Sequence, residues 1–311
     1  MFEKEQQQII ESLNSQGSSK SWIVIGPKGI GKEDFAKNLV KVLTHDFNEY
    51  NPNVQWISCG LTETAKKEIQ KAILAGETPE DKEWAKKTEI TVDDVRDGCH
   101  FLSLKSNKIK ILVFNLADDM NENAQNALLK TLEEPYSNTL ILLLCENIGK
   151  LVPTILSRCQ KLRLIAPDKS EFKKQLVKKY PDLTDVDLEE LSFLSDNVFG
   201  FADELVQQDG LMLYANLKEI LVPLNQLNAR DLLLVSEKMT KDKDVYDLTK
   251  RLLLKLLVAL TKSQTNCSLE KAYLLSELYE KTKSSFAQID SMNLDKKQAL
   301  ISIIYQIAEV L

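Results

Sequence analysis

Short apolar runs alternate with helical stretches along the first half of the chain. Most of these runs lack polar alternation, which is expected of strands buried on both faces of a parallel sheet. The predicted strands are Trp22–Ile25, Val54–Ser58, Ile111–Leu116, Leu140–Cys145 and Lys161–Ile165. Apolar residues at helical spacing predict helices between them, at Lys32–Leu43 and Asn123–Glu133. The alternation therefore predicts an α/β domain whose parallel sheet is covered by helices.

The pattern becomes helical throughout after Pro167. Asp168, followed three residues later by Glu171, predicts a helix start with a capping box. Short helices follow, and then longer amphipathic ones such as Leu248–Leu260 and Lys297–Leu311. The expected fold class is therefore α/β plus all-α. We expect three domains: an α/β domain at 1–166, a small three-helix domain at 167–209 and an all-α domain at 210–311.

Composition and charge exclude several classes of protein. The 311 residues carry a net charge of −6, whereas a chain that binds nucleic acid by itself needs a local surplus of lysine and arginine. The five cysteines and two histidines are well separated, and their spacing matches no metal site. The longest apolar runs are far shorter than a membrane span, and the polar N-terminal residues lack a signal core. We expect a cytoplasmic protein with reduced thiols and no membrane contact.

A glycine-rich loop between the first predicted strand and helix matches the phosphate-binding pattern GxxxxGK. Its candidate nucleotide-binding residues are Gly26, Gly31 and Lys32. In a working loop, backbone N–H groups hold the phosphates, and the serine or threonine after the lysine places its hydroxyl on magnesium. This chain has Glu33 at that position. A carboxylate is too long for a site sized for a hydroxyl, and without a metal it would repel the phosphates.

The strand that should carry the metal-binding acid is altered as well. Functional P-loop enzymes end this strand with an aspartate, often followed by a glutamate, whereas this chain has Asn115 and Leu116. Asp118 and Asp119 lie past the strand tip, and we expect solvated turn or helix-start residues there. The loop is either a fold relic that still needs its glycines or a site of residual nucleotide binding. We expect no hydrolysis in cis, no bound metal and no ATP cofactor.

Two further motifs carry a resemblance to a known family. The segments Asn126–Pro135 (NALLKTLEEP) and Pro153–Gln160 (PTILSRCQ) resemble signatures of the clamp-loader branch of the AAA+ family. The resemblance implies an AAA+ P-loop domain, a small helical lid domain and a C-terminal collar domain that joins five subunits. Two features depart from the motor members of this branch. Asp203 stands where they have an arginine, and the polar, lysine-rich stretch 61–90, interpreted as an excursion from the sheet, replaces a four-cysteine zinc module. No zinc cofactor is therefore expected.

The altered nucleotide site implies a member of this branch that does not hydrolyse ATP. Such a member is a structural and regulatory subunit of the bacterial DNA polymerase III clamp loader, and not an enzyme by itself. ATPase activity would belong to partner subunits and polymerase activity to the whole complex. The implied partners are the motor ATPase and clamp-opening subunits, with the sliding clamp and primed DNA met through the assembly. The alternatives are a self-sufficient AAA+ ATPase, in which Glu33 and Asp118 or Asp119 replace the missing ligands, or an ATP-binding sensor.

Arg158, in the Ser-Arg-Cys motif, is the candidate catalytic residue. The resemblance implies that it acts in trans, on ATP bound to the neighbouring subunit, where an arginine stabilises the charge of the transferring phosphoryl group. From the residues alone, an internal salt bridge at a helix end is the other interpretation. Glu133 and Glu134 occupy the last turn of a predicted helix and oppose its dipole. They are either solvated or form a contact between subunits.

Overall fold

The chain folds into two compact units, Met1–Ala166 and Pro167–Leu311. The computed structural model describes residues 2–14, 20–45, 51–59, 89–221, 226, 228–265, 269–292 and 294–311. Most of the predicted excursion at 61–90 lies outside these residues. Its last residue, Ile90, is fully buried and forms a parallel bridge with Met120, so that end belongs to the core. The division of the second unit at residue 209 stays a prediction.

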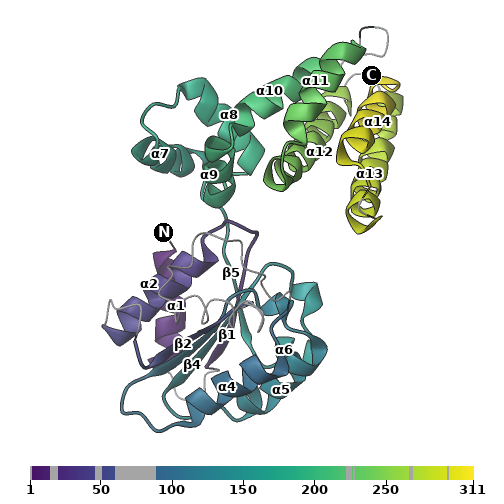
Figure 1. Ribbon diagram of the computed structural model, residues 1–311. Coiled ribbons are helices and arrows are strands. Elements are labelled where there is room, and N and C mark those ends of the chain that lie inside the picture. The colour runs from purple at the N-terminus through teal and green to yellow at the C-terminus, as the bar shows by residue number, and fades with distance from the viewer. Residues whose placement is uncertain are drawn as a thin grey trace, which may run out of the picture. The chain divides into compact units, whose positions relative to one another are not determined.

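The first unit is built on a five-stranded parallel sheet in the order β2-β3-β4-β1-β5 (Figure 1). The strands are β1 (Ser21–Ile25), β2 (Val54–Ile57), β3 (Lys110–Phe114), β4 (Thr139–Cys145) and β5 (Gln160–Arg163). The three central strands are buried along their whole length because helices cover both faces of the sheet. The parallel sheet expected from the uninterrupted apolar runs is confirmed.

Helices cover both faces of this sheet, with α1 and α2 on one face and α4, α5 and α6 on the other (Figure 1). Their bounds are α1 (Glu3–Asn14), α2 (Lys32–Thr44), α4 (Val92–Ser103), α5 (Glu122–Glu133) and α6 (Pro153–Leu156), with 3₁₀ turns η1 (Ala117–Asp119) and η2 (Ile148–Lys150). Ile23 and Ile25 of β1 share a core with Leu128 of α5. Asn121 begins α5 by accepting a hydrogen bond from the Ala124 N–H.

Three strands end earlier than the sequence predicts. β2 ends at Ile57 instead of Ser58, and β5 ends at Arg163 instead of Ile165. The third is β3. The run from Ile111 was expected to stay extended to Leu116, but β3 ends at Phe114. Leu116 adopts a left-handed conformation with φ 61° and begins η1. An apolar run marks burial and not extension, and here the chain turns at Leu116 to bring Ala117 into the core.

The second unit is entirely helical within its described residues. Its helices are α7 (Lys169–Lys179), α8 (Asp185–Ser195), α9 (Phe199–Gln207), α10 (Gly210–Ile220), α11 (Ala229–Met239), α12 (Lys243–Thr265), α13 (Leu269–Met292) and α14 (Lys296–Ala308). Asp168 begins α7 by accepting from the Ser170 and Glu171 N–H groups, while the Glu171 carboxylate accepts from Gln175. Five leucines of α12 are buried as their spacing predicts: Leu248, Leu252, Leu253, Leu256 and Leu257. Leu260, predicted on the same face, is partly buried.

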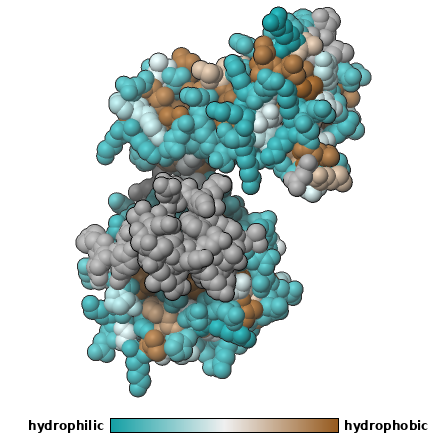
Figure 2. Space-filling model, in the orientation of Figure 1, coloured by the Kyte–Doolittle hydropathy of each residue, from teal (hydrophilic) through white to brown (hydrophobic). Residues whose placement is uncertain are grey.

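On the face shown in Figure 2, the described residues are largely hydrophilic, with apolar residues gathered in a few places. Large apolar side chains that remain exposed include Leu234 of α11 and Tyr273 of α13. None of the helices in the described part of the chain is both long enough and apolar enough to cross a membrane.

Candidate functional site

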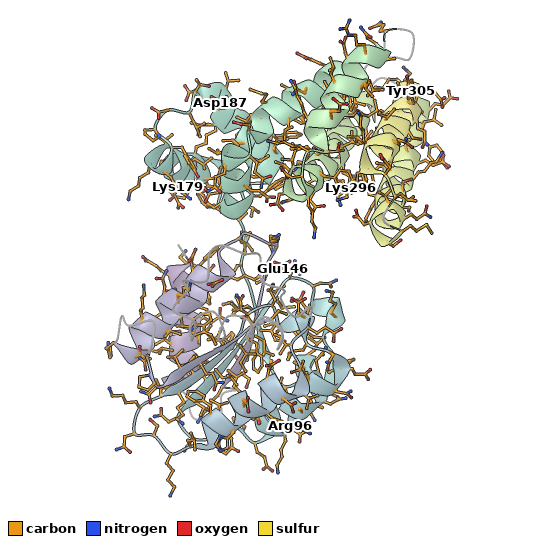
Figure 3. The ribbon with its side chains drawn as sticks, in the orientation of Figure 1. Arg96, Glu146, Lys179, Asp187, Lys296 and Tyr305 are labelled. Carbon is orange, nitrogen blue, oxygen red and sulfur yellow. The ribbon has the colours of Figure 1, made fainter. Side chains whose placement is uncertain are left out.

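The glycine-rich loop joins β1 to α2, and its carbonyl oxygens accept hydrogen bonds from its own lysine, Lys32. Gly31 has φ 95°, a conformation that a side chain disfavours, and it begins α2. The Lys32 ammonium donates to the carbonyl oxygens of Gly26 at 2.8 Å and Pro27 at 3.0 Å. It also pairs with Glu146, which directly follows β4 (Figure 3), at 3.4 Å. Only 7% of the Lys32 side chain is exposed. The charge that would hold phosphate is therefore satisfied by the protein itself.

The two altered metal positions contact each other. The Asn115 side-chain N–H donates to Glu33 Oε2 at 3.1 Å, and Lys37 pairs with Glu33 Oε1 at 2.7 Å. The fold thus brings together two residues that lie 82 positions apart in the sequence. Leu116 supplies an apolar side chain, which cannot bind magnesium. The place of a hydroxyl and a carboxylate is taken by the Glu33 carboxylate, which accepts a hydrogen bond from the Asn115 amide and is neutralised by the Lys37 ammonium.

Asp118 differs from its predicted role as a solvated residue. Its side chain is buried, with 8% of the residue exposed, and η1 directs it at the carboxyl end of β4. There Oδ1 accepts from the Glu146 N–H at 3.2 Å and Oδ2 accepts from the Asn147 N–H at 3.0 Å. The prediction that Asp118 is solvated was wrong, because the sequence does not reveal that the turn at Asp118 packs against the backbone after β4. Both carboxylate oxygens have structural partners.

The Ser-Arg-Cys motif follows the short helix α6 and places Arg158 at the surface of the first unit. Its side chain is 32% exposed and pairs through Nη2 with Glu133 Oε1 at 2.5 Å. Nη1 donates to the Thr154 carbonyl at 2.9 Å and to Ser157 Oγ at 3.3 Å. The internal salt bridge that the residues alone left open is therefore present in this chain. It also gives Glu133 a partner that neither interpretation of that residue foresaw.

A buried glutamine, missed in the sequence, fixes the segment before α6. Gln125 lies on the apolar face of α5, three positions before Leu128. Its amide donates to the carbonyls of Met120 at 3.0 Å and Lys150 at 3.1 Å, and its oxygen accepts from the Val152 N–H at 2.8 Å. A polar residue among buried helical positions was the signal that could have found it, because such a group needs partners.

Within the described residues, no group of three or more histidines, cysteines, aspartates or glutamates is placed to hold a metal ion. Burial raises the pKa of the Cys145 and Cys159 thiols to about 12, so both are neutral and unreactive near pH 7. Cys267 and most of the stretch 61–90 lie outside this part of the chain. The expectations of no zinc and no bound ATP stay predictions. Asp203 of α9 pairs with Lys179 of α7.

Comparisons with known proteins agree with this architecture. A family model described as "DNA polymerase III, delta subunit" matches residues 2–168. The DNA polymerase III subunit delta' of Pseudomonas aeruginosa is 33% identical over 181 residues, covering 56% of this chain and 52% of that protein. The subunit gamma of Buchnera aphidicola from Acyrthosiphon pisum is 28% identical over 179 residues, covering 56% and 47%. The chain thus spans about half the length of the curated relatives it matches.

Among solved structures, a DNA polymerase III gamma subunit-related protein of Thermotoga maritima aligns with 99% of this chain and 98% of its own, at 22% identity and a TM-score of 0.49. The parallel sheet and the strand–glycine loop–helix define the class as a P-loop α/β domain, and a helical unit follows it along the chain. The chain belongs to the DNA polymerase III delta subunit family. The resemblance to the clamp-loader branch is confirmed, and delta-prime subunits are among its relatives.

Proposed function

We propose that this chain is a non-hydrolysing structural and regulatory subunit of the DNA polymerase III clamp loader, supplying Arg158 in trans to the neighbouring ATPase subunit. It would help to load the sliding clamp onto primed DNA in the cytoplasm. The observation that carries the proposal is the contact between Glu33 and Asn115, which fills the place of the metal ligands with groups unsuited to Mg·ATP. Family membership supports the setting.

The chemistry of the loop favours a subunit that leaves its own site unused. A phosphate entering the loop would have to displace the bonds of Lys32 to Gly26 and Pro27. The Glu33 carboxylate would then repel it, by roughly 4 kcal/mol per pair of unit charges at ~4 Å in an effective dielectric of about 20. Asn115 supplies no charge to hold the magnesium that would offset this repulsion. Nucleotide binding and hydrolysis therefore belong, in this proposal, to the motor subunits.

The position of Arg158 suits a role toward another subunit. Its guanidinium is planar, permanently charged and partly exposed, and its fork matches phosphate oxygens. An exposed ion pair such as the one with Glu133 is worth only about 0.2–1 kcal/mol, so a phosphate can displace it. An arginine acting in trans contributes about 10³–10⁵ in rate in nucleotide hydrolases. The α-helical region 210–311 would serve as the collar that joins motor and clamp-opening subunits.

The test is ATP hydrolysis by a clamp loader reconstituted from this chain, its motor and clamp-opening subunits, the clamp and primed DNA. Arg158→Ala should leave folding and assembly intact but sharply lower hydrolysis and clamp loading. Arg163→Ala, which removes an exposed arginine of β5, is the matched control and should leave both unchanged. Hydrolysis at the wild-type level with Arg158→Ala would show that the trans role is wrong.

Two alternative functions give different results with the purified chain. A self-sufficient ATPase would turn over ATP alone, and Lys32→Ala would abolish this turnover. An ATP-binding sensor would bind a fluorescent ATP analogue without cleaving it. The left-handed glycines of the retained loop, at 29 and 31, are the observation that keeps these alternatives in view. The proposal expects neither turnover nor saturable binding.

A further inference from the structure

Glu133 occupies an electrostatically unfavourable place in the fold. It is the last residue of α5, where the helix dipole disfavours a negative charge by about 0.3–1 kcal/mol. Its carboxylate is half exposed and pairs with the guanidinium of Arg158, a residue that lies just after α6 and 25 positions beyond Glu133 in the sequence. The pair joins the ends of the two family signatures, NALLKTLEEP and PTILSRCQ.

The acceptors around the Arg158 guanidinium differ in charge. Nη1 is held by two neutral oxygens, the Thr154 carbonyl and Ser157 Oγ. Nη2 is held by the charged carboxylate of Glu133. A phosphate oxygen is an anionic acceptor that a guanidinium binds as it binds a carboxylate, so it competes with Glu133 for Nη2 more directly than with the neutral acceptors. The backbone oxygen and the hydroxyl can keep the side chain oriented while the carboxylate leaves.

We propose that Glu133 is a positioning residue for Arg158. It neutralises and orients the guanidinium while no nucleotide is present, and it yields Nη2 to a phosphate oxygen of ATP on the adjacent subunit. This inference rests on the proposed trans role of Arg158. Because Glu133 has to be displaced each time, its carboxylate weakens the apparent affinity of the neighbouring site for ATP. Its removal should therefore tighten that affinity.

The size of the effect follows from the exposure of the pair. Both side chains are partly solvated, at 32% for Arg158 and 49% for Glu133. Exposed ion pairs are worth about 0.2–1 kcal/mol, and one tenfold change corresponds to about 1.36 kcal/mol. Glu133→Gln, which keeps the shape and removes the charge, should lower the KM for ATP by about 1.4- to 5-fold. The kcat should stay unchanged, because removing the competing carboxylate charge strengthens binding in the ground state and the transition state alike.

The experiment is a double-mutant cycle in the reconstituted loader, with hydrolysis measured against ATP concentration for wild type, Glu133→Gln, Arg158→Ala and the double variant. Glu133→Gln should lower KM only when Arg158 is present. Glu134→Gln, which removes the same charge one residue later, is the control and should leave KM unaltered. Removing an acid from a helix C-terminus is not expected to harm folding, and the thermal transition of each variant verifies this.

The outcomes separate the inference from the function on which it rests. If Arg158→Ala lowers hydrolysis but Glu133→Gln leaves KM unchanged or raises it, Glu133 does not compete with phosphate and the inference fails alone. If Glu133→Gln lowers KM equally in the Arg158→Ala background, the effect does not pass through the guanidinium and the inference also fails. If Arg158→Ala has no effect on hydrolysis, the proposed function itself falls.

Discussion

Replacing Asp118 by asparagine tests how the carboxyl end of the sheet is held. The carboxylate accepts one hydrogen bond from the Glu146 N–H and another from the Asn147 N–H, and Asp118 is buried. An asparagine keeps one acceptor oxygen and turns an NH₂ donor toward the other N–H. That buried N–H is left unsatisfied at about 1–3 kcal/mol, and the remaining bond loses its charge assistance, worth about 1 kcal/mol. Asp118→Asn should therefore lower the free energy of unfolding by about 2–4 kcal/mol.

Urea unfolding followed by tryptophan fluorescence measures this loss in the first unit. All three tryptophans, at 22, 56 and 84, belong to that unit, and Trp22 is buried in β1. Asp119→Asn is the matched control, because among the described residues the Asp119 carboxylate accepts a hydrogen bond from Cys59 Sγ alone, at 3.7 Å. The control should change stability by less than about 0.5 kcal/mol.

The same pair of variants separates a structural carboxylate from a catalytic one. If Asp118 were a magnesium ligand of a self-sufficient ATPase, Asp118→Asn would abolish turnover by the purified chain at little cost in stability. Equal unfolding free energies for Asp118→Asn and Asp119→Asn would refute the reasoning from the two backbone hydrogen bonds.

Two further predictions concern packing and the thiols. Gly98→Ala in α4 should destabilise the first unit by about 1–2 kcal/mol, because the cost of overpacking outweighs the better helix propensity of alanine. The new Cβ would lie 2.6 Å from Ile57 Cδ1 and 3.0 Å from Leu112 Cδ1. An unchanged urea unfolding curve would contradict this prediction. Burial raises the pKa of Cys145 and Cys159 to about 12 in the folded chain. The free energy of unfolding should therefore be intact below pH 9 and decline as the pH rises from 9 toward 12. In that range the unfolded chain releases thiol protons that the folded chain retains. Iodoacetamide should label both thiols slowly in the folded chain and rapidly in urea; equal rates would contradict the burial argument.

Local patterns in the sequence located most of the elements. Apolar runs, most of them without alternation, marked the five strands, and helical spacing marked α2, α5 and the leucine face of α12. These features follow from period and burial alone, which a linear sequence records. Strand ends were not located by the same patterns. The turn at Leu116 interrupts an apolar run, and nothing in the local sequence distinguishes a turn residue there from a strand residue.

The candidate site was found by motif, but its contacts were not. The sequence indicated Lys32, Glu33, Asn115 and Arg158 as candidate site residues, because each departs from or matches a spaced pattern of known chemistry. It did not reveal that Lys32 bonds to its own loop. The sequence showed that Glu133 has an unfavourable position at a helix end, but it did not reveal that Arg158 is its counter-ion, just as it did not reveal the partners of Lys32.

The sequence by itself determined the class of fold, and it predicted a nucleotide loop without its usual metal ligands and an arginine in a segment that resembles a family signature. Only the tertiary structure decided that Glu33 meets Asn115, that Asp118 is buried against the segment after β4, and that Glu133 neutralises Arg158. These pairs are separated by 25 to 82 residues. Whether such residues meet depends on the spatial order of the strands in the parallel sheet. That order brings together, at one edge of the sheet, the ends of segments that are distant along the chain.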